Sequence, residues 1–210
     1  MGVSGIILAG GRSLRMGQDK TLLLFNNETL IERTIKELQN VVDEIIIASN
    51  HTAKYNIPSL VEVPDTYPGM GPLGGLHAGL IASKYQHAFV ISGDMPLFTG
   101  ALATYLLERR AGYDVIVPEI RSRWEPLCAV YSRSCIKPIE NCLQADVRKV
   151  YRFYPQVRVL KISEPELKLV GDVEELFYNL NTPEDFNSLV LKGDRGIFRE
   201  VRRYMDEFLT

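Results

Sequence analysis

The residues best suited to chemistry lie close together near the N-terminus, in the stretch LAGGRSLRMGQDK at residues 8–20. Gly10 and Gly11 allow the backbone to approach a ligand without a Cβ in the way. Backbone N–H groups in such a turn bind anions, and Arg15 and Lys20 add positive charge that suits a chain of phosphates. The stretch therefore predicts a phosphate-binding loop, against the alternative of a glycine-rich connector with solvated charges.

This loop matches neither of the two commonest phosphate-binding motifs. A Walker A loop requires G-x-x-x-x-G-K-[ST], but here Gly17 is followed by Gln18 and Asp19 before Lys20. The dinucleotide pattern G-x-G-x-x-G is absent as well. The residues thus indicate a phosphate-holding turn of a third kind.

Asp94 is the candidate metal ligand. It follows an apolar run at residues 88–92 and precedes Pro96, so its carboxylate is expected just beyond the end of a strand. Mg²⁺ in a nucleotide site takes one or two carboxylates together with phosphate oxygens and waters. The alternative is an aspartate that serves only as a turn residue or a helix N-cap.

A second glycine-rich segment, residues 69–75, leads into a helix that is expected to start at Pro72. The N–H groups at a helix N-terminus favour anions or carbonyl oxygens, so this segment could contact a nucleotide, or it could be a flexible connector. Asn50 follows the strand expected at residues 44–48 and is a candidate contact to a ribose or a base. Asp65, taken alone, has the pattern of a turn residue.

Short apolar runs alternate with helical patterns along the chain. The strands expected from these runs are residues 5–9, 44–48, 60–63, 88–92, 115–117, 127–131 and 157–162. The expected helices are residues 30–38, one from Pro72, residues 101–110, one around 135–152 and one capped by Thr182, with Pro183 in its first turn and Asp185 completing a capping box. This alternation predicts a parallel sheet covered on both faces. Ligands bind such sheets outside the carboxyl ends of the strands, where these motifs fall.

The length of 210 residues suits one domain with a modest appendage. We expect the domain to cover residues 1–192 and an amphipathic helix to cover residues 193–210, because apolar side chains recur there at helical spacing. That helix is expected to pack on its own domain, with dimerisation or partner binding as the alternative.

Composition excludes several classes of protein. A net charge of −2 argues against a general nucleic-acid binder, and no stretch approaches the roughly 20 apolar residues of a membrane span. The N-terminus lacks the basic region of a signal peptide, so a cytoplasmic protein is expected. Cys128, Cys135 and Cys142 form no C-x-x-C pair and are expected to be free thiols that are buried or half-buried.

Taken together, the N-terminal motif resembles the signature L-A-G-G-x-S-x-R-M-G-x-D-K of the MobA-like nucleotidyltransferases, which include the molybdenum cofactor guanylyltransferases. The resemblance extends over about residues 5–190. The segments that carry it are residues 8–11, 15–17, 19–20, 71–75, 92–96 and 179–183.

The resemblance implies a three-layer α/β/α, Rossmann-like nucleotidyltransferase fold with a mostly parallel sheet. It also implies transfer of GMP from GTP to the terminal phosphate of molybdenum-bearing molybdopterin, with release of pyrophosphate and with Mg²⁺ as cofactor. Arg15, Lys20 and Asp94 would be the catalytic residues, with Asp94 on the metal. The nucleotide site implied by the motifs comprises Leu8, Ala9, Gly10, Gly11, Lys20, Asn50, Asp65, Gly71, Pro72, Leu73, Gly74 and Asp94.

The second-substrate site is less well defined by the sequence. The resemblance implies that Asn179 and Asn181 lie near the metal and the second substrate, although turn residues before a capped helix are commonly structural. Trp124, the single tryptophan, could flank a pterin or pack within its loop. Some family members carry a histidine before the proline at position 126, whereas this chain has Glu125.

Two alternatives to guanylyl transfer stay open. One is a related nucleotidyltransferase that uses CTP or a sugar phosphate, and the other is a sensor that binds GTP without turnover. The expected partners are GTP and molybdopterin, with no nucleic acid and no membrane. Transient contacts with proteins that deliver molybdopterin or accept the product, and a monomer or weak oligomer, complete these expectations.

Overall fold

The structure is a computed structural model that describes residues 2–9, 20–25, 27–50, 55, 57 and 60–192. Gly10, Gly11 and Arg15 of the expected phosphate loop therefore lie outside the described residues, as does the C-terminal helix expected over residues 193–210. The division of the chain at residue 192 stays a prediction.

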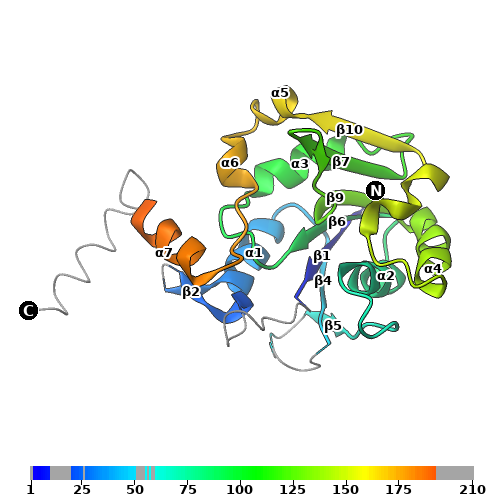
Figure 1. Ribbon diagram of the computed structural model, residues 1–210, viewed down its shortest axis with the longest axis horizontal. Helices are drawn as coiled ribbons and strands as arrows, with labels where there is room; N and C mark the ends of the chain where they lie inside the picture. The colour runs from blue at the N-terminus through cyan, green and yellow to red at the C-terminus, as the bar shows by residue number, and fades with distance from the viewer. Residues whose placement is uncertain are drawn as a thin grey trace, which may run out of the picture.

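The centre of the molecule is a mixed, mostly parallel sheet (Figure 1). Its strands lie in the order β10-β7-β9-β6-β1-β4-β5, and β8 pairs with β7. Their bounds are β1 (Ser4–Leu8), β4 (Glu44–Ala48), β5 (Val61–Val63), β6 (His87–Ser92), β7 (Val115–Ile120), β8 (Arg123–Trp124), β9 (Cys128–Ser132) and β10 (Val159–Ser163). Strand β9 runs antiparallel to β6 and β7, while β6, β1, β4 and β5 are parallel to their neighbours in that run. The expected mostly parallel sheet is confirmed.

Both faces of the central strands are buried. Ile7 and Ile91 belong to the hydrophobic cluster on one face, and Ile6 and Val90 belong to the cluster on the other. The register places Ile6 opposite Val90, so residues of the same face are neighbours across the sheet. Burial on both faces explains why these strands are continuous apolar runs instead of alternating with polar residues.

Helices cover both faces of this sheet. Helices α1 (Leu30–Leu38) and α3 (Gly100–Glu108) pack on one face, and α2 (Pro72–Ala82) and α4 (Ile136–Gln144) pack on the other (Figure 1). The shorter elements are η1 (Lys20–Leu22), η2 (Arg133–Cys135), η3 (Val150–Gln156), α5 (Glu164–Leu167) and α6 (Val173–Leu176). The three-layer α/β/α arrangement is thus confirmed.

The helix expected around residues 135–152 is shorter than its apolar pattern indicated. Helix α4 ends at Gln144, and Asp146 adopts a left-handed conformation with φ 53°. The N–H of Val147 then donates to the Cys142 carbonyl over 2.9 Å, and the N–H of Asp146 donates to the Leu143 carbonyl. This pair of hydrogen bonds is a Schellman motif, which ends a helix by satisfying its last carbonyls.

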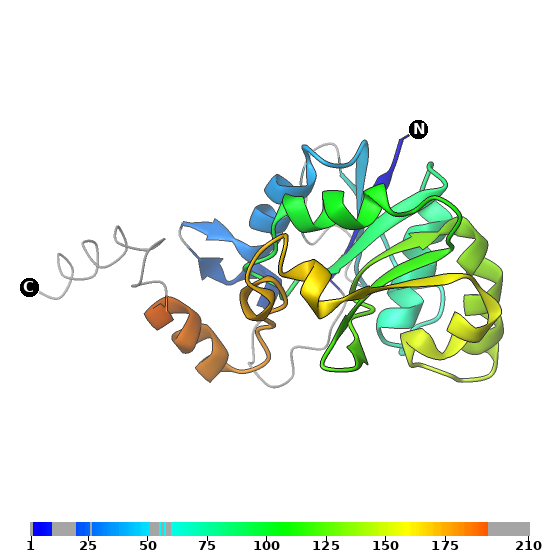
Figure 2. The same cartoon turned by 90° about the horizontal axis from the view of Figure 1, so that it is seen from above.

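A small hairpin and the last described helix form a side cluster next to the main sheet. Strands β2 (Leu24–Phe25) and β3 (Glu28–Thr29) make the hairpin, and α7 (Pro183–Lys192) lies beside it (Figure 2). The N-terminus of α7 has the expected capping box, because the Asp185 carboxylate accepts from the Thr182 N–H and the Thr182 hydroxyl accepts from the Asp185 N–H. Buried Leu180, between hairpin and helix, anchors the segment that precedes α7.

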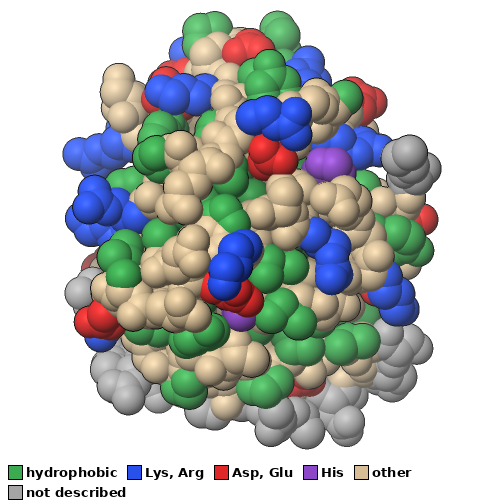
Figure 3. Space-filling model, turned by 90° about the vertical axis from the view of Figure 1, so that its right-hand side faces the viewer, with side chains coloured by type: hydrophobic (Ala, Val, Ile, Leu, Met, Phe, Trp, Pro, Cys, Tyr) green, Lys and Arg blue, Asp and Glu red, His purple; other side chains and the backbone are tan. Residues whose placement is uncertain are grey.

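The distribution of surface charge fits the small net charge of the chain, and the state of the cysteines fits the expectation from their spacing. On the side of α2 and α4, acidic and basic side chains are interspersed without a large area of one charge (Figure 3). Cys128, Cys135 and Cys142 are free and buried, as expected. Within the described residues, no helix is both long and apolar enough to cross a membrane.

Candidate active site

The loops that carry the sequence motifs meet along the carboxyl edge of the sheet. The Gly93 N–H, beyond β6, donates to the Leu8 carbonyl over 3.0 Å, and the Ala9 N–H donates to the Ala48 carbonyl over 2.9 Å. These hydrogen bonds continue the strand pairing for one residue beyond β1 and β6. The loops that follow β1 and β6 therefore lie side by side at the carboxyl edge of the sheet, which is where ligands bind parallel sheets.

Lys20 and Asp94 are joined through the backbone of Leu180. The Lys20 ammonium donates to the carbonyls of Leu180 and Asn181 over 2.8 Å and 2.9 Å. The Leu180 N–H donates in turn to the Asp94 carbonyl over 2.9 Å. Three motifs that are far apart in the sequence thus converge on one buried leucine, with a cation and a carboxylate-bearing loop on either side.

The Asp94 side chain is half-buried and oriented by a neighbour. Its Oδ1 accepts a hydrogen bond of 2.6 Å from the Ser92 hydroxyl. Among the described residues, no group of three or more His, Cys, Asp or Glu side chains could form a metal cage. A single carboxylate fits Mg²⁺, which is usually held by one or two carboxylates and completed by phosphate oxygens and waters.

Asn50 and Asp65 hold each other beside the start of α2. The Asn50 amide donates to the Asp65 carboxylate over 3.1 Å, and the Asp65 N–H donates to the Asn50 side-chain oxygen over 3.3 Å. A Cβ on Gly74 would lie 3.3 Å from Asp65 Oδ2, so the glycine lets this carboxylate approach the helix closely. Burial raises the pKa of Asp65, while the Asn50 hydrogen bond opposes that rise.

The turn before α2 needs a glycine as well. Gly71 has φ 64°, a conformation that side chains with a Cβ rarely adopt, and Pro72 then occupies the first turn of the helix. Helix α2 therefore starts beside the Asn50–Asp65 pair, at the carboxyl edge of the sheet.

The whole chain can now be compared with known proteins. A family model described as the MobA-like NTP transferase domain matches residues 5–159. The chain belongs to this family. It is 44% identical over 182 residues to a protein of Pelotomaculum thermopropionicum named probable molybdenum cofactor guanylyltransferase, covering 87% of this chain and 89% of that one.

Two further likenesses agree with this assignment. A molybdenum cofactor guanylyltransferase of Desulfosudis oleivorans is 35% identical over 87% of this chain and 92% of its own length. The solved structure of molybdopterin-guanine dinucleotide biosynthesis protein A from Archaeoglobus fulgidus superposes with a TM-score of 0.77, at 22% identity, over 88% of this chain and 95% of that chain. The last likeness shows that the fold is shared.

In this MobA-like chain, the residues expected to contact the second substrate fall in two places. Asn179 and Asn181 flank Leu180, whose backbone binds both Lys20 and Asp94, and both asparagines line a pocket. The Trp124 ring instead packs against Tyr151 and Tyr154, with ring centroids 5.8 Å and 5.0 Å away. The ring of Trp124 is thus packed on η3, and its contact with a pterin stays a prediction.

Three residues that no motif singled out also shape the MobA-like site. The Tyr55 hydroxyl shares a 2.7 Å hydrogen bond with Thr21 and donates to the Ala9 carbonyl over 3.5 Å, so it contacts residues on both sides of the glycine loop. Arg33 donates from Nε to the Pro96 carbonyl over 2.6 Å and thereby ties α1 to the Asp94 loop. Tyr55 and Arg33 belong to no motif, so the sequence alone did not indicate a role for them.

His77 is the third of these residues, and it supports the loop that carries Asp65. Its ring is buried on α2, with Nδ1 3.2 Å from the Thr66 hydroxyl and Nε2 3.4 Å from the Glu140 carboxylate. The Tyr67 ring meets it edge-on at 5.3 Å. The loop after β5 is therefore held from beneath by α2 and α4.

Proposed function

We propose that this protein transfers GMP from GTP to the terminal phosphate of molybdenum-bearing molybdopterin and releases pyrophosphate. The observation that carries the proposal is the meeting of Lys20 and Asp94 at Leu180. It occurs in a chain that is 44% identical to a relative named as such a guanylyltransferase. GTP and molybdopterin are the proposed substrates, and the proposed location is the cytoplasm.

The reaction needs no nucleophile from the protein. An oxygen of the acceptor phosphate attacks the α-phosphorus of GTP, and the bond from that phosphorus to the bridging oxygen breaks as pyrophosphate leaves with the electron pair. Catalysis of this step consists mainly of positioning and of stabilising charge. The buried cysteines suit no nucleophilic role, since burial raises the pKa of Cys135 to about 12.

Lys20 is the described cation best placed to act on the phosphates. Two carbonyls fix its ammonium beside the Asp94 loop, so little motion is needed to bring positive charge to the triphosphate. Gly10, Gly11 and Arg15 would hold the same phosphates from the glycine loop. This division of roles extends the loop chemistry expected from the sequence.

Asp94 would hold Mg²⁺, with its carboxylate oriented by the Ser92 hydroxyl. The ion, when bound, supplies positive charge that offsets the charge on the phosphate oxygens. The fit rests on a single hard-oxygen ligand at a site where substrate phosphates can complete the coordination.

The nucleotide would lie toward β4 and β5, and the acceptor toward β7 and β9. Leu8 and Ala9, the Asn50–Asp65 pair and the start of α2 at Gly71–Gly74 would form the nucleotide side at the strand ends. Asn179 and Asn181 line the pocket next to the Lys20 ammonium, from which the second substrate would approach in line.

A nucleotide-preference titration tests the proposal. With Mg²⁺ present, GTP is expected to raise the melting temperature more than CTP, ATP or UTP does, because binding to the folded state stabilises it. Preferential stabilisation by CTP would favour the cytidylyl alternative. Pyrophosphate release on addition of molybdopterin then separates an enzyme from a sensor, since a folded, GTP-bound protein without turnover would be a sensor.

A further inference from the structure

A pocket of about 970 Å³ adjoins the proposed reaction centre. One wall is the β7–β8 hairpin with Arg121, Arg123 and Glu125, and the opposite wall includes Asn179 and Asn181. The last two residues flank Leu180, whose backbone binds both Lys20 and Asp94. The volume is that of a small-molecule site, and one wall is continuous with the residues proposed to handle the phosphates.

Glu125 differs from the other acidic residues of this pocket. Glu164 pairs with Lys168 at 3.3 Å, Glu174 pairs with Arg121 at 2.6 Å, and Asp172 caps α6 through the Glu174 N–H. The half-buried Glu125 carboxylate makes no hydrogen bond or ion pair with any part of the chain that the structure describes. Burial raises the pKa of Glu125, and only Arg123 opposes the rise. Two hydrogen-bond donors of a ligand would replace the hydrogen bonds from water that this carboxylate loses on burial.

The hairpin that carries Glu125 is held in an unusual conformation. Arg121 and Ser122 have φ 49° and 60°, which gives the two-residue turn between β7 and β8 two left-handed residues, neither of them glycine. The turn is held by Glu164, which accepts from the Arg121 N–H, and by the Arg121–Glu174 pair. Such strain persists where the surrounding contacts enforce it, commonly at ligand sites.

The backbone of Glu125 is fixed on both sides. Its N–H donates to the Pro118 carbonyl over 2.9 Å, and its carbonyl accepts from the Cys128 N–H over 3.1 Å. These contacts tie the residue to β7 and β9, on the opposite side of β6 and β1 from the Asn50–Asp65 pair (Figure 1). The backbone that carries this carboxylate is therefore fixed on the proposed acceptor side and not on the nucleotide side.

We propose that Glu125 is the specificity residue for the acceptor, and that its carboxylate accepts hydrogen bonds from the N3–H and the 2-amino group of the pterin ring. This proposal rests on the function proposed above. An ionised carboxylate offers two acceptor oxygens and no donor, which matches two adjacent N–H donors and gives charge-assisted hydrogen bonds. Guanine presents the same donor pair, so the test must distinguish a pterin from the base of GTP.

The experiment measures binding of two heterocycles to the full chain by fluorescence titration. The probes are 6-hydroxymethylpterin and 6-hydroxymethyllumazine, which has an oxygen in place of the 2-amino group. The wild-type protein is expected to prefer the pterin by about tenfold or more, because a site built for a donor rejects an analogue without it. Equal affinity for the two probes, or no binding of either, overturns the proposal without any variant.

The variants separate the role of Glu125 from general effects on the pocket. Glu125→Gln is expected to reduce the pterin preference to about twofold or less, whereas Glu125→Asp, which keeps the charge, retains part of it. Asp172→Asn is the matched control, since Asp172 lines the same pocket but already accepts from the Glu174 N–H as the N-cap of α6. An unchanged preference in Glu125→Gln contradicts the proposal.

A second titration, with nucleotides, shows whether Glu125 binds the pterin or the guanine base of GTP. GTP and ITP differ by the 2-amino group of the base, and Glu125→Gln is expected to leave their relative affinities unchanged. A lost preference for GTP would mean that Glu125 binds guanine and would overturn the proposal. With the molybdenum-bearing acceptor, the variant is expected to raise KM for the acceptor and not for GTP. Absence of pyrophosphate release from wild-type protein would count against the proposed function, while the pterin titration tests the site independently.

Discussion

Asn50 and Asp65 are hydrogen-bonded to each other twice, from the carboxyl ends of β4 and β5. The amide orients the carboxylate, and the backbone N–H of Asp65 orients the amide in return. Because Asp65 also lies against Gly74 of α2, this pair connects two strand ends with the start of a helix. If the nucleotide binds as proposed, a change to either residue should therefore affect its binding.

Replacing Asn50 with Ala should weaken nucleotide binding with little cost in stability. Asp65 would lose the partner that orients its carboxylate, and a misplaced positioning group is expected to raise KM for GTP about tenfold. Asn50 is exposed, so the free energy of unfolding should fall by about 1 kcal/mol or less. Steady-state kinetics and urea unfolding measure the two effects, with the exposed Gln144→Ala as control. An unchanged KM would remove Asn50 from the nucleotide site.

Lys20→Met should weaken the binding of GTP more than the binding of GMP. The ammonium is proposed to act on the phosphates, so GTP should lose more affinity than GMP, and kcat/KM should fall by about 100-fold or more. Loss of the contacts to Leu180 and Asn181 should also lower the free energy of unfolding by about 1–3 kcal/mol.

Lys36→Met is a suitable control for this change, because Lys36 is a highly exposed lysine on α1. Isothermal titration with GTP and GMP provides the comparison. Equal losses of affinity for the two nucleotides would show that Lys20 serves the fold and not the phosphates.

Asp94→Asn should abolish transfer while the protein stays folded. The carboxylate lies at a strand end and is half-buried, so its neutral isostere should change the melting temperature only slightly. Pyrophosphate release with and without added Mg²⁺ measures the effect, and Asp146→Asn at the end of α4 is the control. Turnover that survives in the Asn variant would contradict the metal assignment.

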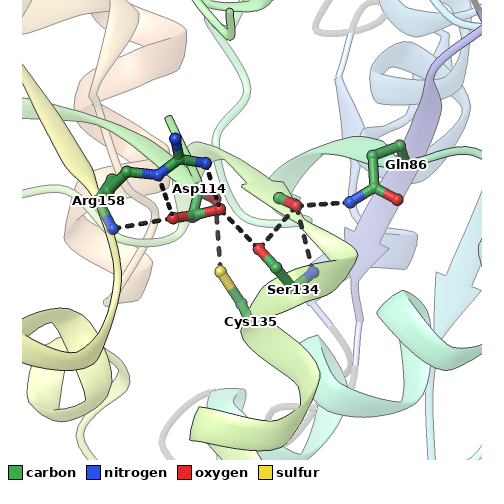
Figure 4. Close-up of polar contacts among 6 residues, drawn as sticks. Gln86, Asp114, Ser134, Cys135 and Arg158 are labelled. Carbon is green, nitrogen blue, oxygen red and sulfur yellow. Dashed lines mark hydrogen bonds and ion pairs between the residues drawn. The ribbon is translucent and has the colours of Figure 1, made fainter. Parts of the chain in front are cut away.

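Asp114 should make stability depend on pH in the acid range. At the amino end of β7 its carboxylate accepts from the Arg158 N–H, from the Arg158 guanidinium and from the Ser134 hydroxyl (Figure 4). The Arg158 side chain is the main cause that lowers the pKa of Asp114 to about 2 from 3.8. Since the folded state lowers this pKa, the stabilisation is complete above pH 3.8 and is lost as the pH falls toward 2.

Urea unfolding of wild type and Asp114→Asn at several pH values tests this linkage. The wild type should be more stable by about 1 kcal/mol at pH 5, after allowance for screening by solvent, and the difference should shrink toward pH 2. Transfer activity at neutral pH should be unaffected, because the cluster lies at the opposite end of the strands from Asp94. A difference that is constant with pH would contradict the assigned cause.

Elements governed by local patterns were predictable. Helix α1 and strand β4 match their expected bounds because an apolar stripe, a capping threonine and a run of branched residues each act over a few positions. The predicted C-terminal end of the helix over 135–152 was wrong, because a left-handed residue at Asp146 ends the helix although apolar residues follow it. The reversed direction of β9 has no signal in its own residues, since a buried strand has the same composition in either direction.

The sequence by itself determined which residue types follow which strands, and hence that glycines, Lys20, Asp65 and Asp94 would gather at one edge of a sheet. Only the tertiary structure decided how they are held. Lys20 meets Leu180 across 160 positions and Asn50 meets Asp65 across 15, while Glu125 faces a pocket whose other wall comes from residues 179 and 181. Local propensity depends on near neighbours and sets the elements, whereas such contacts depend on strand order and register. Those properties are decided by burying both faces of the sheet at once.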